Sequence, residues 1–251
     1  MLGVDLIAWL QKSLPWLTPV MAALSRLGDV GFFELAVAAV YWTVSPSVGA
    51  RLAVLLLVSS GTNAAAKLAS GSPRPYWVAG EVTAHAAEAS YGLPSGHAQN
   101  AAAGWGRLAA VSSRRGVWLA AAGLVVAIGV SRWQLGVHAP VDTLGGLVLG
   151  VGLLAAALRL EAPLTGWLAR RRAATQLLVA AGASLAVVAV GVAAQLSPWA
   201  GPPAASWLAR AQTVAPGTPL RPESLAPVAR SAGALLGFGA GLVLLERRGG
   251  F

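Results

Sequence analysis

His138, Asp142 and His97 are the residues of this chain whose types and spacing point most directly to chemistry. His138 and Asp142 are four residues apart, which on a helix places the carboxylate beside the imidazole. An aspartate in that position can accept a hydrogen bond from one ring nitrogen, so that the other nitrogen is free to attack an electrophile. His97 could protonate a leaving oxygen. An isolated His-Asp pair would nevertheless be more typical of a structural histidine at an interface.

The run Pro94-Ser95-Gly96-His97 predicts the start of a helix that can bind an anion. Free backbone N–H groups and the positive end of the helix dipole favour negative charge there. Gly96 lets the backbone approach an oxygen closely, and the Ser95 hydroxyl can donate a hydrogen bond. A plain capping turn, with Ser95 as the cap, is the alternative interpretation.

Lys67, Arg74 and Arg132 could surround these groups with positive charge. Lys67 and Arg132 end apolar segments, and Arg74 follows Lys67 by seven positions. Arginine presents a planar fork that matches phosphate oxygens, and lysine presents a point charge. Three converging cations would therefore suit a phosphate dianion. The alternative is that these long side chains only extend toward the membrane interface.

The composition indicates the elements that must position these residues. Of 251 residues, 56% are hydrophobic and only 11% are charged, and the mean hydropathy is +0.66. A soluble domain has about 25% charged residues. Several apolar runs approach the roughly 20 residues that a transmembrane helix needs. We therefore expect an all-α fold, a polytopic transmembrane helix bundle.

The predicted organisation is a single membrane domain over residues 1–251 with about six to seven spans. Residues 4–27 form an interfacial or first helix, residues 28–160 a catalytic core, and residues 161–251 the C-terminal helices, with an external proline-rich segment at 197–229. The expected spans cover residues 30–44, 48–67, 97–112, 116–130, 140–160, 173–196 and 231–245.

Basic residues predict the orientation and argue against nucleic acid as a partner. The net charge is +9, but the arginines cluster at 114–115, 170–172 and 247–248, between or after apolar runs. That is the pattern of cytoplasmic loops. If the spans alternate, all three clusters lie on one side, and the loop at 70–93 and the turn at 131–139 lie together on the external side. The chain has no cysteine, which excludes a disulfide framework and a thiolate metal site.

The order of the polar runs resembles the signature of the type 2 phosphatidic acid phosphatase superfamily. Lys67 to Arg74-Pro75 comes first, then Pro94 to His97, then Ser131-Arg132 with His138 and Asp142. The resemblance is specific over residues 67–142 and extends to about 28–160. The superfamily also includes glucose-6-phosphatase and vanadium haloperoxidases. The resemblance implies a bacterial integral-membrane lipid phosphate phosphatase of the cytoplasmic (inner) membrane, with its active site facing outward.

The resemblance also implies the role of each site residue. His138 would be the nucleophile that becomes phosphorylated, and Asp142 would orient it. His97 would protonate the leaving group and then activate water. The implied reaction needs neither a metal nor another cofactor. The implied phosphate-binding residues are Lys67, Arg74, Ser95, Gly96 and Arg132.

We therefore expect a metal-independent phosphatase of a lipid phosphate or pyrophosphate held in the bilayer. Undecaprenyl pyrophosphate and glycerolipid phosphates, such as phosphatidate and phosphatidylglycerol phosphate, are the favoured substrates. Three alternatives remain: a soluble phosphomonoester as substrate, as in glucose-6-phosphatase, phosphoryl transfer between lipids, and a non-catalytic membrane protein.

Six further residues carry weaker expectations. Asn63 lies one turn before Lys67 and could orient it or serve helix packing. Glu81, His85 and Glu88 belong to the external loop and could touch a lipid head group, but we favour solvated side chains. Tyr76 and Trp77 are expected as aromatic anchors at the level of the head groups.

Overall fold

The computed structural model describes residues 3–198 and 201–249, and these residues form helices joined by loops, without a strand. The expected segment 197–229 includes residues 199–200, which lie outside the described residues. The N-terminal part comprises α1 (Val4–Ser13), a 3-10 turn (Pro15–Leu17) and α2 (Thr18–Arg26). The core contains α3 (Val30–Thr43), α4 (Pro46–Ser70), α5 (Pro75–Val78), α6 (Gly96–Ala109), α7 (Arg115–Gln134) and α8 (Pro140–Ala169). The C-terminal part comprises α9 (Ala173–Gln195), α10 (Ala205–Val214) and α11 (Ala226–Arg247).

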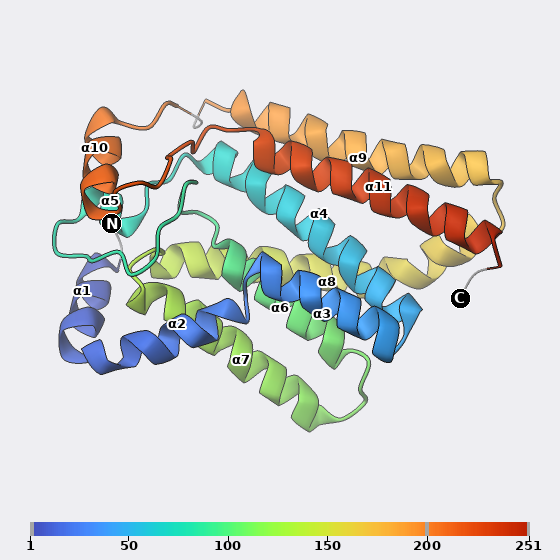
Figure 1. Ribbon diagram of the computed structural model, residues 1–251, viewed down its shortest axis with the longest axis horizontal. Helices are drawn as coiled ribbons and strands as arrows, with labels where there is room; N and C mark the ends of the chain where they lie inside the picture. The colour runs from blue at the N-terminus through green and yellow to red at the C-terminus, as the bar shows by residue number, and fades with distance from the viewer. Residues whose placement is uncertain (1–2, 199–200, 250–251) are drawn as a thin grey trace.

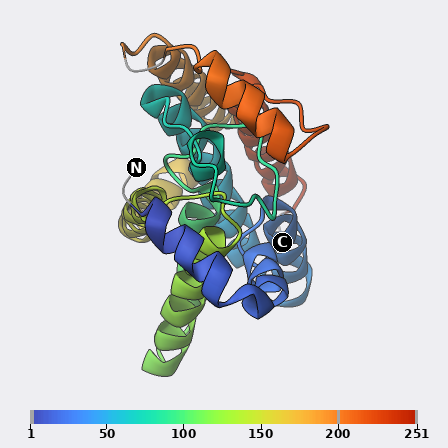
Figure 2. The same cartoon turned by 90° about the vertical axis from the view of Figure 1, so that its left-hand side faces the viewer.

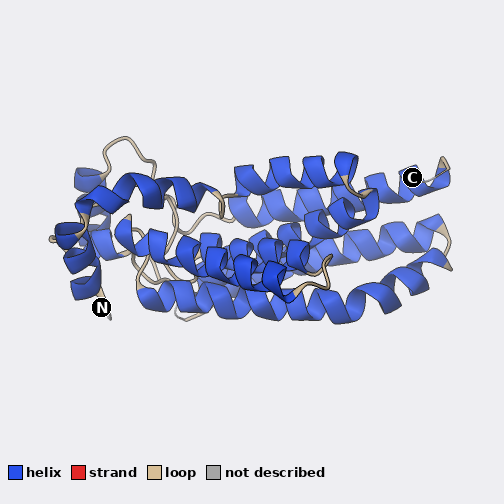
Figure 3. Cartoon of the chain, turned by 90° about the horizontal axis from the view of Figure 1, so that it is seen from below, coloured by secondary structure: helices blue, strands red, loops and turns tan. Residues whose placement is uncertain are grey.

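The helices form an elongated bundle, so the expected all-α membrane fold is confirmed. In Figure 1, α9 and α11 run side by side along one edge, α4 crosses beside them, and α7 lies on the opposite edge. Figure 3 shows that the long helices share one general direction. By length and composition, α4, α7, α8, α9 and α11 can each cross a membrane. The protein is therefore an integral membrane protein.

Two of the expected spans, α3 and α6, are helices of only 14 residues. Most of α6 is buried among other helices, which explains why it carries the polar side chains of Gln99 and Asn100. A helix that is shielded from lipid by its neighbours does not need an apolar surface all round. The segments of the N-terminal part are shorter still, and α2 packs along α7.

Close packing of α6 against α8 depends on small residues. A side chain at Gly146 of α8 would meet the backbone carbonyl of Ser95, and one at Gly150 would meet that of Gln99. Gly146 and Gly150 are four residues apart, so they lie on one face of α8. Small residues at this spacing let two helices approach closely in a membrane. This contact sets the start of α8 beside the start of α6.

Gly146→Val is expected to destabilise the protein because its side chain would push α8 away from the Ser95 carbonyl. Overpacking of this kind typically costs about 1–3 kcal/mol. Thermal unfolding in detergent should therefore show a lower Tm. Gly152→Val is the matched control, because nothing lies within 4 Å of a side chain added there. An equal loss of Tm in both variants would contradict the packing argument.

A cap of short helices covers one end of the bundle. Figure 2 faces this end, where α10 and α1 lie on either side of the loop that follows α5. Tyr76 and Trp77 of α5 are buried in the core of this cap, so the expectation that they are headgroup anchors is wrong. The expected polar segment at 197–229 also contains a helix, α10, whose Ala211 packs into the same core. Apolar residues of α1, α5 and α10 bury one another here, and no pattern within one segment of the sequence predicts that contact.

Candidate active site

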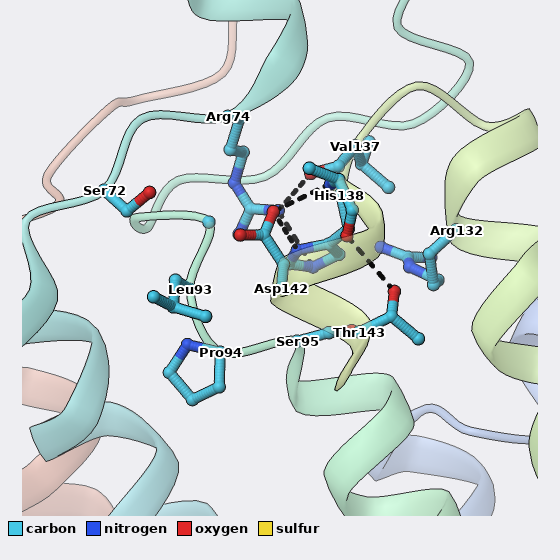
Figure 4. A network of polar contacts seen from close by, with 12 residues as sticks. Ser72, Arg74, Leu93, Pro94, Ser95, Arg132, Val137, His138, Asp142 and Thr143 are labelled. Atoms are coloured by element: carbon cyan, nitrogen blue, oxygen red, sulfur yellow. Dashed lines mark hydrogen bonds and ion pairs between the residues drawn. The ribbon is translucent and has the colours of Figure 1, made fainter. Parts of the chain in front are cut away.

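His138 occupies the short link between α7 and α8, where it is fully buried. Its Nε2 lies 3.1 Å from Nη1 of Arg74, and its Nδ1 lies 3.5 Å from Oδ2 of Asp142 (Figure 4). An arginine can only donate a hydrogen bond, so Nε2 must be the acceptor in this pair. The proton of a neutral imidazole is then on Nδ1, on the side of Asp142. The geometry therefore places the lone pair of the ring on Nε2, where it accepts from Arg74.

The environment keeps His138 neutral. Burial lowers the pKa of His138 well below its usual value, and the positive charges of Arg74 and Lys67 lower it further. A neutral imidazole with its lone pair on Nε2 is the form that can act as a nucleophile. Asp142 stands in the first turn of α8, and its Oδ2 also accepts a hydrogen bond from the backbone N–H of Ala139 at 2.8 Å.

Arg74 is buried in the loop between α4 and α5, and its guanidinium connects His138 to the loop that follows α5. Its position is fixed by the many acceptors around it, because a planar fork satisfies several of them at once. The acceptors are the Ser90 carbonyl (2.6 Å) and hydroxyl (3.2 Å), the Tyr91 carbonyl (3.1 Å), the Val137 carbonyl (3.0 Å) and His138 Nε2.

Lys67 and Arg132 complete a cluster of three cations around His138. Lys67 ends α4 and donates from Nζ to the carbonyl of Tyr91 at 2.5 Å. Arg132 ends α7 and donates from Nη1 to the Ser25 hydroxyl of α2 at 2.6 Å. Its buried Nε has no hydrogen-bond partner among the described residues. We call the Nζ group of Lys67 and the guanidinium groups of Arg74 and Arg132 the anion site.

Glu88 is also part of this cluster, contrary to the expectation of a solvated side chain. Its Oε1 accepts from Nη2 of Arg132 at 2.5 Å, and its Oε2 lies 3.7 Å from Nη2 of Arg74. Sequence reasoning missed it because loop residues 79–95 have no periodicity that assigns a side chain to the interior. Charge balance was a signal that could have found Glu88. Three clustered cations beside the single carboxylate of Asp142 call for a second negative charge nearby.

The expected helix start at Ser95 is present, and its hydroxyl acts as a cap. The Ser95 hydroxyl accepts from the backbone N–H of Ala98 at 3.4 Å, which agrees with the capping alternative. The backbone N–H of Ser95 donates to the carbonyl of Asp142 at 2.8 Å, and this hydrogen bond joins α6 directly to α8. Gly96 follows at the first position of α6, where an added side chain would meet Asn63 Oδ1 at 3.1 Å.

His97, at the second position of α6, is partly buried and makes no side-chain hydrogen bond to the residues that the structure describes. It lies within electrostatic reach of Arg132 and Glu88. The side chain is therefore close to the anion site and free of other partners there, so it can reach an arriving substrate.

A buried polar network holds α6 against α4. Asn63 donates to Gln99 Oε1 at 2.8 Å and to the Pro94 carbonyl at 3.3 Å, and Gln99 donates to the Ser59 carbonyl at 2.8 Å. Asn63 thus serves helix packing and supports the start of α6, and among the described residues its side chain makes no hydrogen bond to Lys67. Buried amides that satisfy one another in this way fix the register of two helices.

Comparison with known proteins places this arrangement in context. Residues 48–165 match the family described as the PAP2 superfamily. A solved structure described as the first transmembrane PAP2 type phosphatidylglycerolphosphate phosphatase from Bacillus subtilis has the same fold, with a TM-score of 0.56 and 24% sequence identity. The match covers 64% of this chain and 85% of that one. No curated protein matches the chain.

Proposed function

Because the chain belongs to the PAP2 superfamily through residues 48–165, we propose that it hydrolyses a lipid phosphate or pyrophosphate through a phosphohistidine on His138. The observation that carries this proposal is the position of His138, whose Nε2 lies beside Arg74 with Asp142 behind the other ring nitrogen. The unpartnered Nε of Arg132 adds a buried donor for a phosphoryl oxygen. A buried donor without a partner is costly unless a ligand satisfies it.

The first chemical step forms the phosphohistidine. Nε2 of His138 attacks phosphorus, and the bond from phosphorus to the ester or pyrophosphate oxygen breaks. His97, whose protonated form the negative charge of the bound phosphoryl group would favour, gives its proton to that leaving oxygen. The imidazole of His138 becomes positively charged, and Asp142 stabilises it from the Nδ1 side.

The second step returns the enzyme to its starting state. His97 is now neutral and accepts a proton from a water molecule, whose oxygen attacks phosphorus. The bond between phosphorus and Nε2 breaks, inorganic phosphate forms from a monoester, and His138 is neutral again. The anion site stabilises the extra negative charge that develops on the phosphoryl oxygens in both steps.

An apolar groove beside the site favours a lipid substrate over a soluble one. The groove has a volume of about 450 Å³ and opens between α4 and α8. Pro94 and Val141 line it, and they are the direct neighbours of Ser95 and Asp142. A hydrocarbon tail could therefore lie in the groove while its phosphate lies at His138. The lining residues are Ala66, Ser70, Leu93, Pro94, Val141, Leu144, Gly145, Val148 and Leu149.

Val148→Trp is expected to raise KM for a long-chain phosphatidate by about fivefold or more, roughly 1 kcal/mol, because the indole would fill the groove. The KM for a short-chain analogue, whose tail does not reach Val148, should change little. Val151→Trp is the matched control, since Val151 is an exposed residue of α8 that does not line the groove. Equal effects on long and short chains would count against the groove as the tail site.

The orientation in the membrane follows from the arginine clusters and is part of the proposal. The α8–α9 connection and the end of α11 lie at the end of the bundle away from α1, α5 and α10 (Figure 1). Residues 170–172 and 247–248 are in these two segments. By the positive-inside pattern that end is cytoplasmic, so the active site would be at the external face of the bacterial inner membrane.

The test is release of inorganic phosphate by detergent-purified protein in excess EDTA. The substrates are undecaprenyl pyrophosphate, phosphatidate, phosphatidylglycerol phosphate and glucose 6-phosphate, and His138→Ala is the inactive control. Release from a lipid, abolished in the variant, supports the proposal and names the substrate class. Release from glucose 6-phosphate alone, or no release by folded protein, would overturn it.

A further inference from the structure

The side chain of Glu88 lies where a substrate phosphate would have to bind. Its carboxylate contacts Arg132 at 2.5 Å and Arg74 at 3.7 Å, which are two of the three cations in the anion site. The side chain is 27% exposed, so it has a path to solvent. We propose that Glu88 is a specificity-determining residue that competes with the substrate for the anion site, so that a doubly charged phosphoryl group displaces it and a singly charged phosphodiester does not. This inference rests on the proposed function.

Charge explains why such a competitor would discriminate between ligands. Glu88 brings one negative charge to a site with three cations. A phosphomonoester dianion brings two charges and three terminal oxygens, so it gains more from the same cations than the carboxylate does. A phosphodiester brings a single charge, like Glu88, and has only two such oxygens. The need to displace Glu88 therefore keeps the abundant anionic phosphodiester lipids of a membrane out of the anion site.

Hydrogen bonds hold the backbone around Glu88, so displacement of its carboxylate would need a movement of the side chain. The Glu88 carbonyl accepts from the Tyr76 hydroxyl at 3.1 Å, and the Ala89 carbonyl accepts from the N–H of Arg221 at 3.2 Å. The Tyr91 hydroxyl donates to the carbonyl of Gly201 at 3.0 Å. Two of these contacts come from the segment between α9 and α11, which lies outside the family match. That segment thus keeps the carboxylate beside the two arginines.

Glu88 stays negatively charged in the pH range where the enzyme would work. Burial alone would raise the pKa of Glu88, but the charges of Arg74 and Arg132, with smaller effects from His97 and Lys67, lower it to about 2. A lowered folded pKa means that the stabilisation by these pairs is present above about pH 4.5 and is lost as the pH falls through about 2. Protonation of Glu88 therefore does not remove its carboxylate from the anion site near neutral pH. A competing anion must displace it.

The first test is calorimetric titration of the detergent-purified full chain with sodium tungstate, a phosphate-like dianion. Glu88→Gln and Glu88→Ala should each bind tungstate at least about tenfold more tightly than the wild type, because no carboxylate has to be displaced. Tungstate should also raise the Tm of both variants more than that of the wild type. Glu81→Gln is the matched control, since Glu81 is exposed on the same loop. Unchanged or weaker binding in both Glu88 variants overturns the proposal.

The second test uses kinetics and a lipid phosphodiester. In Glu88→Gln, KM for phosphatidate should fall while kcat stays within about threefold of the wild type, and dioleoyl phosphatidylglycerol should become an inhibitor at least about tenfold stronger. A fall of kcat without a fall of KM would mean that Glu88 positions Arg132 for the reaction, which contradicts competition. Tighter tungstate binding in the variants without lipid hydrolysis by the wild type would overturn the proposed function alone. Hydrolysis with unchanged tungstate binding would overturn the Glu88 inference alone.

Discussion

His138→Ala is expected to lower kcat for the lipid substrate by about 10³-fold or more, because the atom that would bond to phosphorus is removed. Arg74 and Asp142 also have hydrogen bonds to groups other than His138, but neither can replace Nε2 as a nucleophile at that point. KM should change little, since the anion site and the groove are intact. Phosphate release and substrate binding should be measured on the same preparation.

His85→Ala is the matched control for this variant. His85 is the one histidine of the sequence to which no part in the site is assigned, and it is exposed on the loop after α5. Its backbone N–H donates to the carbonyl of Leu135 at the end of α7. Its loss should leave kcat unchanged. A rapid alkaline quench with radiolabelled substrate should trap labelled phosphate on the wild type and none on His138→Ala. Label retained by His138→Ala would refute the assignment of the nucleophile.

Asp142→Asn is expected to lower kcat by about 10²- to 10⁴-fold, because it removes the charge that orients and stabilises the imidazole. Asp142 Oδ2 faces Nδ1 of His138 at 3.5 Å and accepts from the N–H of Ala139. An asparagine oxygen can still accept from Ala139, and its amide then turns a donor toward Nδ1. The imidazole would shift its proton to Nε2 and lose the lone pair that attacks.

The measurement for Asp142→Asn is a comparison of kcat and Tm with those of the wild type. Because the hydrogen bond to Ala139 can persist, Tm should fall far less than activity does. Asp5→Asn serves as the control, since Asp5 is exposed in α1. Wild-type kcat in Asp142→Asn would show that the carboxylate has no part in the reaction, and equal losses of kcat and Tm would point to a purely structural residue.

The class of the fold could be predicted from the sequence because each long apolar segment must satisfy its backbone as a helix in lipid. The expected segments at 116–130 and 173–196 correspond closely to α7 and α9. Helix ends were less predictable where neighbouring helices decide them. Thus α8 continues to Ala169, beyond the expected end at residue 160, and contains Pro163. The helix α10 lies inside a segment whose prolines suggested only an irregular connection.

Local spacing also singled out the candidate site. His138 lies just before α8 and Asp142 lies in the first turn of that helix, so their distance depends on local geometry. In the same way, residues 95–97 lie together at the start of α6. Lys67, Arg74 and Arg132 come from different elements, and the structure brings them together with His138. Their roles in binding phosphate remain predictions, as do the catalytic roles of the two histidines and the aspartate.

The sequence by itself determined the membrane class, the helical fold and the residues around which the site is built, because apolar length and residue spacing act within one segment of chain. Only the tertiary structure decided the environment of Glu88, the burial of Tyr76 and Trp77, and the pairing of Arg74 with Nε2 of His138. Each of these depends on groups that are far apart in the chain and meet only when the helices pack. Burial and charge pairing depend on these long-range contacts, so no local sequence pattern predicts them.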